Sequence, residues 1–234
     1  MRKARGGMGV ISAGAAAAVL AGAGYVGTTW LRYGRTSAER GSSDPLLDRF
    51  MPTYEVREYH QTRVRAPAEL TFSTARELDM QGSALIRAIF RGRELLMGAD
   101  PGERKPSQSL LSEVLALGWR VLEEEPGREL VMGAVTQPWK ADVEFRGLAP
   151  EEFAAFDEPG YAKIVWTMAV EPTGPDTSNF RTETRVITTD PGSRQRFRRY
   201  WSLVSPGVVL IRYEMLRLVR REAAGRFAGA QPVH

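Results

Sequence analysis

The sequence contains no cysteine and only two histidines, His60 and His234, among its 234 residues. Without cysteine, disulfide frameworks, catalytic thiolates and zinc or iron–sulfur sites with thiolate ligands are excluded. Two histidines far apart in the sequence also provide too few groups for a multi-histidine metal site or a Ser-His-Asp triad. We therefore expect the protein to hold no metal and no other cofactor.

Lysine is scarce as well, with four residues against 28 arginines, and the charges are unevenly distributed. Residues 51–190 carry 16 basic and 23 acidic side chains, whereas residues 191–234 carry nine basic and two acidic ones. Because these two regions together are neutral, we do not expect nucleic-acid binding. We expect the arginines within residues 194–199 to pair with the acidic region or, alternatively, to hold an anionic headgroup.

The N-terminal segment carries no charge over 26 residues, from Gly6 to Leu31, and follows three basic residues. A helix that crosses a bilayer needs about 20 residues, although this segment consists largely of alanine and glycine. We expect residues 1–33 to form a transmembrane anchor, or alternatively a cleaved signal peptide. The protein would then be a single-pass membrane protein, with its domain on either side and residues 34–51 as a polar linker.

Alternation of apolar and polar side chains with a period of two predicts several strands after residue 52. In the first, residues 54–65, the side chains of Val56, Glu58, His60 and Thr62 share one face. Further strands are predicted at residues 119–124, 129–136, 142–146, 163–171 and 179–188. Pro126-Gly127 predicts a tight hairpin between residues 119–124 and 129–136.

Helical periodicity predicts a second set of elements, at residues 70–78, 84–97, 110–117, 150–156 and 193–222. Within the long last helix, Pro206-Gly207 predicts a bend. Residues 224–234 show no periodicity and are expected to be disordered. The order of strands and helices predicts the α+β class, with a curved antiparallel sheet around a long C-terminal helix.

Two runs of residues carry a resemblance to a known superfamily. One is Val64-Arg-Ala-Pro-Ala-Glu-Leu-Thr-Phe72 at the first strand–helix junction, and the other extends from Thr182 through Trp201 to Arg212. With the order of elements, they make residues 52–223 resemble the START-like superfamily, also called SRPBCC or Bet v 1-like. Within it, the chain is similar to an uncharacterised bacterial subgroup related to polyketide cyclases and dehydrases.

The resemblance implies a helix-grip fold with a deep pocket between the sheet and the last helix. Members use this pocket for lipids, sterols, polyketides or quinones. The chain lacks the His/Asp iron triad of the oxygenase members, and no catalytic motif of the superfamily can be transferred to it residue by residue. The resemblance therefore implies a binding site and assigns no catalytic residue.

Inward-facing side chains on the predicted strands, the last helix and their connections are the candidates for lining such a pocket. They combine apolar walls with a few polar groups, as small-molecule sites do. The candidates are Glu58, His60, Trp139, Trp166, Met168, Phe180, Thr182, Thr184 and Trp201. His60 is either a general acid/base, since imidazole suits proton transfer near neutral pH, or a histidine hydrogen-bonded within its strand.

The sequence favours a membrane-tethered carrier or sensor that binds a hydrophobic small molecule, such as a lipid, a quinone or a polyketide-like compound. Two alternatives remain open. A cyclase or dehydratase of polyketide-like substrates would need a polar pair within reach of one ligand carbon. A ligand-free module for protein interaction would instead have bulky side chains filling the space between the sheet and the last helix.

Overall fold

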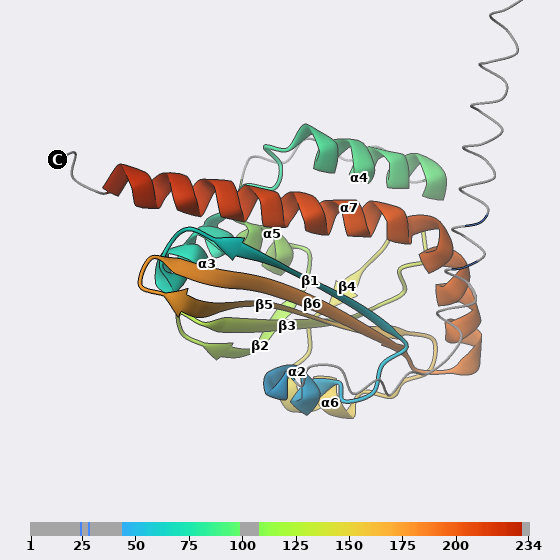
Figure 1. Cartoon of the computed structure of the whole chain (residues 1–234). Coiled ribbons are helices and arrows are strands. Elements are labelled where there is room, and N and C mark those ends of the chain that lie inside the picture. The colour runs from blue at the N-terminus through green and yellow to red at the C-terminus, as the bar shows by residue number, and fades with distance from the viewer. Residues whose placement is uncertain (1–23, 25–27, 29–43, 99–107, 231–234) are drawn as a thin grey trace, which may run out of the picture.

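The computed structural model describes residues 24, 28, 44–98 and 108–230 (Figure 1). Its helices are α2 (Pro45–Phe50), α3 (Ala68–Glu77), α4 (Ala84–Met97), α5 (Leu110–Ala116), α6 (Pro150–Ala155) and α7 (Pro191–Ala230). Its strands are β1 (Val56–Val64), β2 (Arg120–Glu125), β3 (Glu129–Thr136), β4 (Phe145–Arg146), β5 (Ala162–Gly174) and β6 (Thr177–Thr188). Every strand and helix predicted after residue 52 is present, and α2 is an additional helix.

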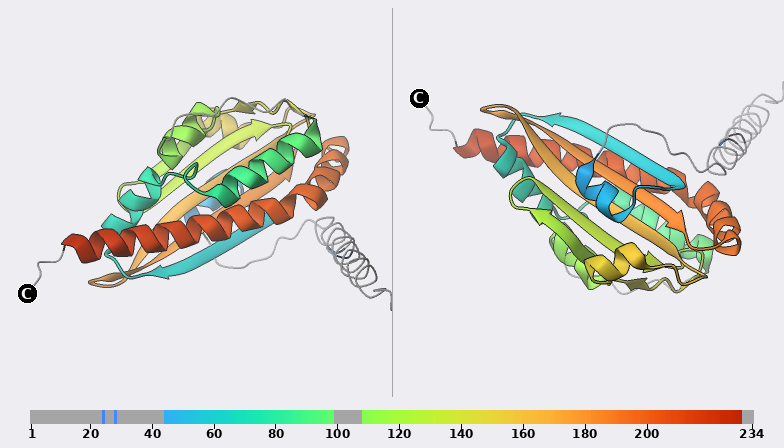
Figure 2. Two further views of the ribbon diagram at one scale, coloured as in Figure 1. Left: turned by 90° about the horizontal axis from the view of Figure 1, so that it is seen from above. Right: turned by 90° about the horizontal axis from the view of Figure 1, so that it is seen from below.

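The strands form one antiparallel sheet in the order β1-β6-β5-β3-β2, and β4 pairs with the end of β3. β2 and β3 are joined by the predicted hairpin, in which Gly127 has a φ of +74°, a conformation that favours glycine. Figure 2 shows α4 and α7 over one face of the curved sheet and α2 and α6 on the other. The six-stranded sheet and the long C-terminal helix confirm the α+β class and fit the helix-grip architecture.

Helix α7 is 40 residues long and changes direction within its first half (Figure 1). Pro206 lies inside this helix, where proline offers no N–H and its ring displaces the preceding turn. The predicted bend is therefore confirmed. A Cβ atom on Gly207 would lie only 2.9 Å from Cγ2 of Ile89, so the absence of a side chain there lets α4 approach α7.

The C-terminal end of α7 extends beyond the predicted end at residue 222. Val219 and Ala223 are fully buried in the core between α7 and the sheet, and Arg226 donates a hydrogen bond of 2.7 Å to Glu77 of α3. These contacts stabilise further helical turns. The tail predicted to be disordered from residue 224 is therefore helical up to Ala230.

Helix α2 lies in the last part of the segment predicted to be a linker. The side chain of Asp44 accepts hydrogen bonds from the N–H groups of Leu46 and Leu47, at 3.2 and 3.1 Å, and so caps the helix. Leu47 and Phe50 are buried in a cluster with residues of β3 and β5. Residues 44–51 therefore pack against the sheet on the face opposite α7.

The expectation of a single-pass membrane location is corrected by the structure. Among the residues that it describes, no helix combines the length and the apolar character needed to cross a bilayer. The predicted anchor, residues 1–33, lies outside the described part of the chain apart from Gly24 and Thr28.

Candidate functional site

Six of the nine predicted pocket residues lie side by side on the face of the sheet that α7 covers. They form two adjacent rows across β1, β6 and β5, with Glu58, Thr184 and Trp166 in one row and His60, Thr182 and Met168 in the other. Residues directly opposite one another in antiparallel strands have Cβ atoms about 4.5–5.5 Å apart. The strand register thus brings four polar side chains together next to an apolar core.

Helix α7 adds Arg212, which the sequence analysis did not identify. Its Nη2 atom donates a hydrogen bond of 2.9 Å to Oγ1 of Thr184, and its guanidinium carbon lies 4.8 Å from the centre of the Trp166 ring. Burial lowers the pKa of Arg212 to about 10, an effect that the nearby charge of Glu58 opposes. The group is therefore still cationic at neutral pH, although it is half-buried. We call Arg212, Glu58, His60, Trp166, Thr182 and Thr184 the Arg212 cluster.

The indole of Trp166 is fixed by a polar contact. Its Nε1 atom donates a hydrogen bond of 2.5 Å to Oγ1 of Thr182, and both side chains are buried. This bond holds the aromatic ring beneath the guanidinium group of Arg212, where cation–π attraction adds to the hydrogen bond with Thr184. The cation is therefore held from β5 and β6 together.

His60 and Glu58 lie at the edge of the Arg212 cluster that is nearer to solvent. Nε2 of His60 is 3.5 Å from Oε2 of Glu58, and these side chains are 10% and 14% exposed. That distance is too long for a good hydrogen bond, and Nε2 has no hydrogen-bond partner among the described residues. The rings of His60 and Tyr213 lie in an edge-to-face arrangement with their centres 5.1 Å apart, and Tyr213 is 58% exposed.

The other three predicted residues lie outside these two rows. Phe180 is fully buried one row further along β6, opposite Val170 and within the core. Trp139 and Trp201 belong to a neighbouring apolar cluster near the first half of α7. There Trp201 stacks on Phe197 with ring centres 5.7 Å apart. The structure therefore gathers the strand residues and separates the two tryptophans from them.

The Arg212 cluster offers hydrogen-bond donors and acceptors of several kinds in a small space. Arg212 can only donate, ionised Glu58 can only accept, and His60 and the two threonines can do both. Their apolar surroundings include the buried side chains of Met132 and Met215. Such a combination can hold the polar group of a molecule whose remainder is apolar. Within the described ranges, no three His, Asp or Glu side chains are placed to share a metal ion.

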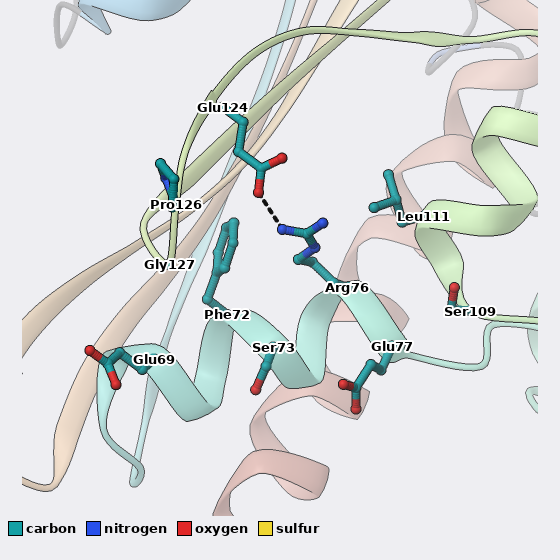
Figure 3. Close-up of a pocket in the computed structure, with 10 residues that line it drawn as sticks. All are labelled: Glu69, Phe72, Ser73, Arg76, Glu77, Ser109, Leu111, Glu124, Pro126 and Gly127. Atoms are coloured by element: carbon teal, nitrogen blue, oxygen red, sulfur yellow. Dashed lines mark hydrogen bonds and ion pairs between the residues drawn. The ribbon is translucent and has the colours of Figure 1, made fainter.

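A hollow of about 430 Å³ lies elsewhere, between α3, the start of α5 and the β2–β3 turn (Figure 3). Arg76 and Glu124 point toward one another across it and form an ion pair. Phe72 lies beside this pair. None of the nine predicted residues lines the hollow, and its two facing charges neutralise each other, so it is a weaker candidate than the Arg212 cluster.

No protein-family model and no curated protein match this sequence. Solved structures similar to the chain include an aromatase/cyclase from Streptomyces sp. R1128, at 14% identity and a TM-score of 0.27, covering 76% of this chain and 99% of that one. A norcoclaurine synthase mutant from Thalictrum flavum has 13% identity and a TM-score of 0.34, and the match covers 73% of this chain and 95% of that one.

A hypothetical protein from Helicobacter pylori has 10% identity and a TM-score of 0.37, and the match covers 81% of this chain and 99% of that one. These likenesses are too distant to carry an inference about the activity of this chain. The helix-grip description rests on the sheet and on α7 themselves.

Proposed function

We propose that the domain binds a small molecule with an apolar body and a polar or anionic group, held between the sheet and α7. The observation that carries this proposal is the position of Arg212. Its guanidinium group has five N–H donors, and among the described residues it donates one hydrogen bond, to Thr184. A cation held next to an apolar core with donors to spare is suited to a carboxylate or carbonyl oxygen of a ligand.

The apolar part of the ligand would lie against the aromatic and aliphatic side chains around the Arg212 cluster. A lipid, a quinone and a polyketide-like molecule all combine such a body with oxygen atoms that accept hydrogen bonds. The role we propose is that of a carrier or sensor, which holds its ligand without converting it.

Binding is tested first by mass spectrometry of the full chain purified from its native host, under gentle and under denaturing conditions. We expect one discrete apolar molecule that is released only on denaturation. A second test uses the fluorescent fatty acid cis-parinaric acid and its uncharged methyl ester. Arg212→Met should weaken binding of the acid by roughly ten-fold or more, because a hydrogen bond to a charged group contributes about 1.5–3 kcal/mol.

Arg199→Met is the matched control, since Arg199 is exposed on the same helix. It should leave binding of both probes unchanged, and Arg212→Met should leave binding of the ester nearly unchanged. If the native preparation is empty and neither probe binds, the proposal is wrong and a ligand-free interaction module is the better description.

A second candidate function, a cyclase or dehydratase, is favoured by the placement of His60 beside Glu58 and near Arg212. The Nε2 atom of His60, which has no hydrogen-bond partner among the described residues, could remove a proton from a carbon next to a carbonyl group, and Arg212 could stabilise the resulting enolate oxygen. The carbanion would attack a second carbonyl carbon of the same chain, and this new carbon–carbon bond closes the ring. The resulting alkoxide would take back the proton held by His60, and loss of that hydroxyl with a neighbouring C–H proton as water would leave a carbon–carbon double bond in the ring. His60→Ala should then abolish ring formation from a linear poly-β-carbonyl substrate without abolishing its binding.

A further inference from the structure

Five arginines line a groove of about 920 Å³ beside the C-terminal half of α7. Arg63 lies at the end of β1 and Arg65 directly follows this strand, whereas Arg217, Arg220 and Arg221 come from α7. β1 is an edge strand of the sheet, so the groove lies at the margin of the domain. It shares no residue with the Arg212 cluster.

The positive charge of this arginine groove is largely uncompensated. Arg217 donates two hydrogen bonds of 2.7 Å to Glu214. In the part of the chain that the structure describes, no carboxylate forms an ion pair with Arg63, Arg65, Arg220 or Arg221. This contrasts with Arg57 and Arg181, whose guanidinium groups are paired with carboxylates.

The local structure explains why these side chains converge. On a helix, residues three and four positions apart lie on one face, which places Arg217 beside Arg220 and Arg221. Like charges at these spacings repel one another and destabilise the helix. Arg63 and Arg65 add two more positive charges from the neighbouring strand. All five side chains are exposed, so they are not part of the core, and a bound anion would stabilise their arrangement by reducing this repulsion.

A small hollow with an apolar side chain, Phe227, adjoins the arginine groove, and we call it the apolar step. The apolar step is lined by Arg65, Asp176, Thr177, Ala224, Phe227 and Ala228. Three of these residues, Arg65, Thr177 and Ala224, also line the groove. Phe227 is half-buried and packs on the edge of the core. A ligand whose anionic group contacts the arginines could therefore lay an apolar or ring-shaped part beside Phe227.

We propose that the arginine groove binds a phosphorylated small molecule, with its phosphate groups on the arginines and its apolar part beside Phe227. Guanidinium groups form paired hydrogen bonds with phosphate oxygens and stay charged at all relevant pH values. Residues 51–190 carry seven more acidic than basic side chains. Because this acidic body repels a long polyanion, a short phosphorylated ligand suits the groove better than a nucleic acid strand.

Isothermal titration calorimetry of the full chain tests the proposal with two probes, inorganic pyrophosphate and ADP. Both probes should bind, with an affinity that falls as salt is added, and ADP should bind more tightly because its ring can use the apolar step. Equal affinities would assign the site to phosphate alone and overturn the part of the proposal that concerns Phe227.

Two double variants test the two walls of the groove separately. Arg220→Gln with Arg221→Gln, and Arg63→Gln with Arg65→Gln, should each weaken binding by roughly ten-fold or more, because each pair removes charge-assisted hydrogen bonds. Arg199→Gln, on the same helix but outside the groove, should bind as the wild type does. All these side chains are exposed, so each variant should have nearly the same thermal unfolding midpoint as the wild type. Measurement of this midpoint checks that each variant folds.

Three results would overturn the proposal. The first is the absence of binding heat with both probes at low salt. The second is unchanged affinity in both double variants. The third is tighter binding of a single-stranded oligothymidine than of either probe, which would make the groove a nucleic-acid surface instead.

Discussion

The two faces of β6 are both covered by helices, yet they are held in different ways. On the face toward α7, Phe180 and Val186 lie in apolar clusters. On the opposite face, Glu183 and Arg185 are charged, and each is only 1% exposed. Strand β6 therefore presents apolar side chains and the hydroxyls of Thr182 and Thr184 to α7, and a layer of buried ion pairs to α2.

The buried charges opposite α7 are paired with one another. Arg185 donates hydrogen bonds to Glu183 at 2.7 Å, to Asp48 at 2.6 Å and to the carbonyl oxygen of Met51 at 2.9 Å. Arg57 donates to both carboxylate oxygens of Glu183, at 2.8 and 3.0 Å. Charges of this kind are tolerated in a protein interior because each is paired and hydrogen-bonded.

Arg185 and Arg212, on opposite faces of the sheet, differ in how many protein groups accept hydrogen bonds from their guanidinium groups. The guanidinium group of Arg185 is held by three protein groups, so it serves to attach α2 to the sheet. Arg212, in contrast, donates one hydrogen bond to the described residues, to Thr184, and retains donors for a ligand. The same side-chain type thus has its contacts within the fold on one face of the sheet, and on the other it is the group for which we propose ligand binding.

The largest effect is expected from Arg185→Met, which breaks the ion-pair layer. It should lower the free energy of unfolding by about 3–5 kcal/mol, because it leaves buried carboxylate charge with fewer partners. The measurement is urea denaturation followed by circular dichroism. Arg146→Met is the control, since Arg146 forms an exposed pair with Glu158 at 3.2 Å and should cost less than about 1 kcal/mol. Equal losses in the two variants would refute the comparison.

A smaller effect is expected from the titration of Glu129. Burial and the neighbouring charge of Asp44 raise the pKa of Glu129 from 4.5 to about 7, although Arg181 opposes this shift. The folded state therefore keeps a proton up to about pH 7 that the unfolded state loses near pH 4.5. Stability should fall as pH rises through this window, by at most about 3 kcal/mol.

Glu129→Gln should remove this slope between pH 4.5 and 7, because an amide does not titrate in this range. Thr167 and Arg181 donate to different carboxylate oxygens of Glu129, so the single carbonyl oxygen of glutamine keeps one of these two hydrogen bonds. Denaturation curves recorded across the window measure the slope. Glu171→Gln changes a half-exposed carboxylate near the same arginine and should leave the slope in place. A slope that survives in Glu129→Gln would assign the pH dependence to another group.

The smallest effect on stability is expected from Arg212→Met. A half-buried cation with one hydrogen bond to the described residues contributes little to folding, so the free energy of unfolding should change by less than about 1 kcal/mol. Urea denaturation of the ligand-free protein measures it. A loss as large as that of Arg185→Met would show that Arg212 has a structural role and would weaken the proposed binding role.

Alternating patterns in the sequence predicted the strands well, because side chains two positions apart must share a face. They also placed Glu58, His60, Thr182 and Thr184 on the face that α7 covers. The ion-pair layer could not be predicted in this way. Charged residues that alternate with apolar ones resemble a solvated face, and only the packing of α2 against the sheet shows that they are buried.

The helix pattern had a similar limit. Arg212 follows Val208 by four positions and precedes Met215 by three, so its position within the apolar stripe of α7 was a signal that could have been used. The continued spacing of four from Met215 through Val219 and Ala223 to Phe227 also indicated a longer helix. Arg194, in contrast, pairs with Glu55 at 2.7 Å, as the charge distribution predicted for this arginine run.

The capping residue of α2 has a practical consequence for where the folding unit begins. Asp44 caps the helix and also pairs with Arg181, while Asp48 pairs with Arg185. A fragment that starts at residue 52 would retain both arginines in the sheet but lose both of these carboxylates. A fragment that starts at Asp44 would keep both carboxylates and their ion pairs. We therefore expect this fragment, and not the one that starts at residue 52, to refold cooperatively and to resist proteases.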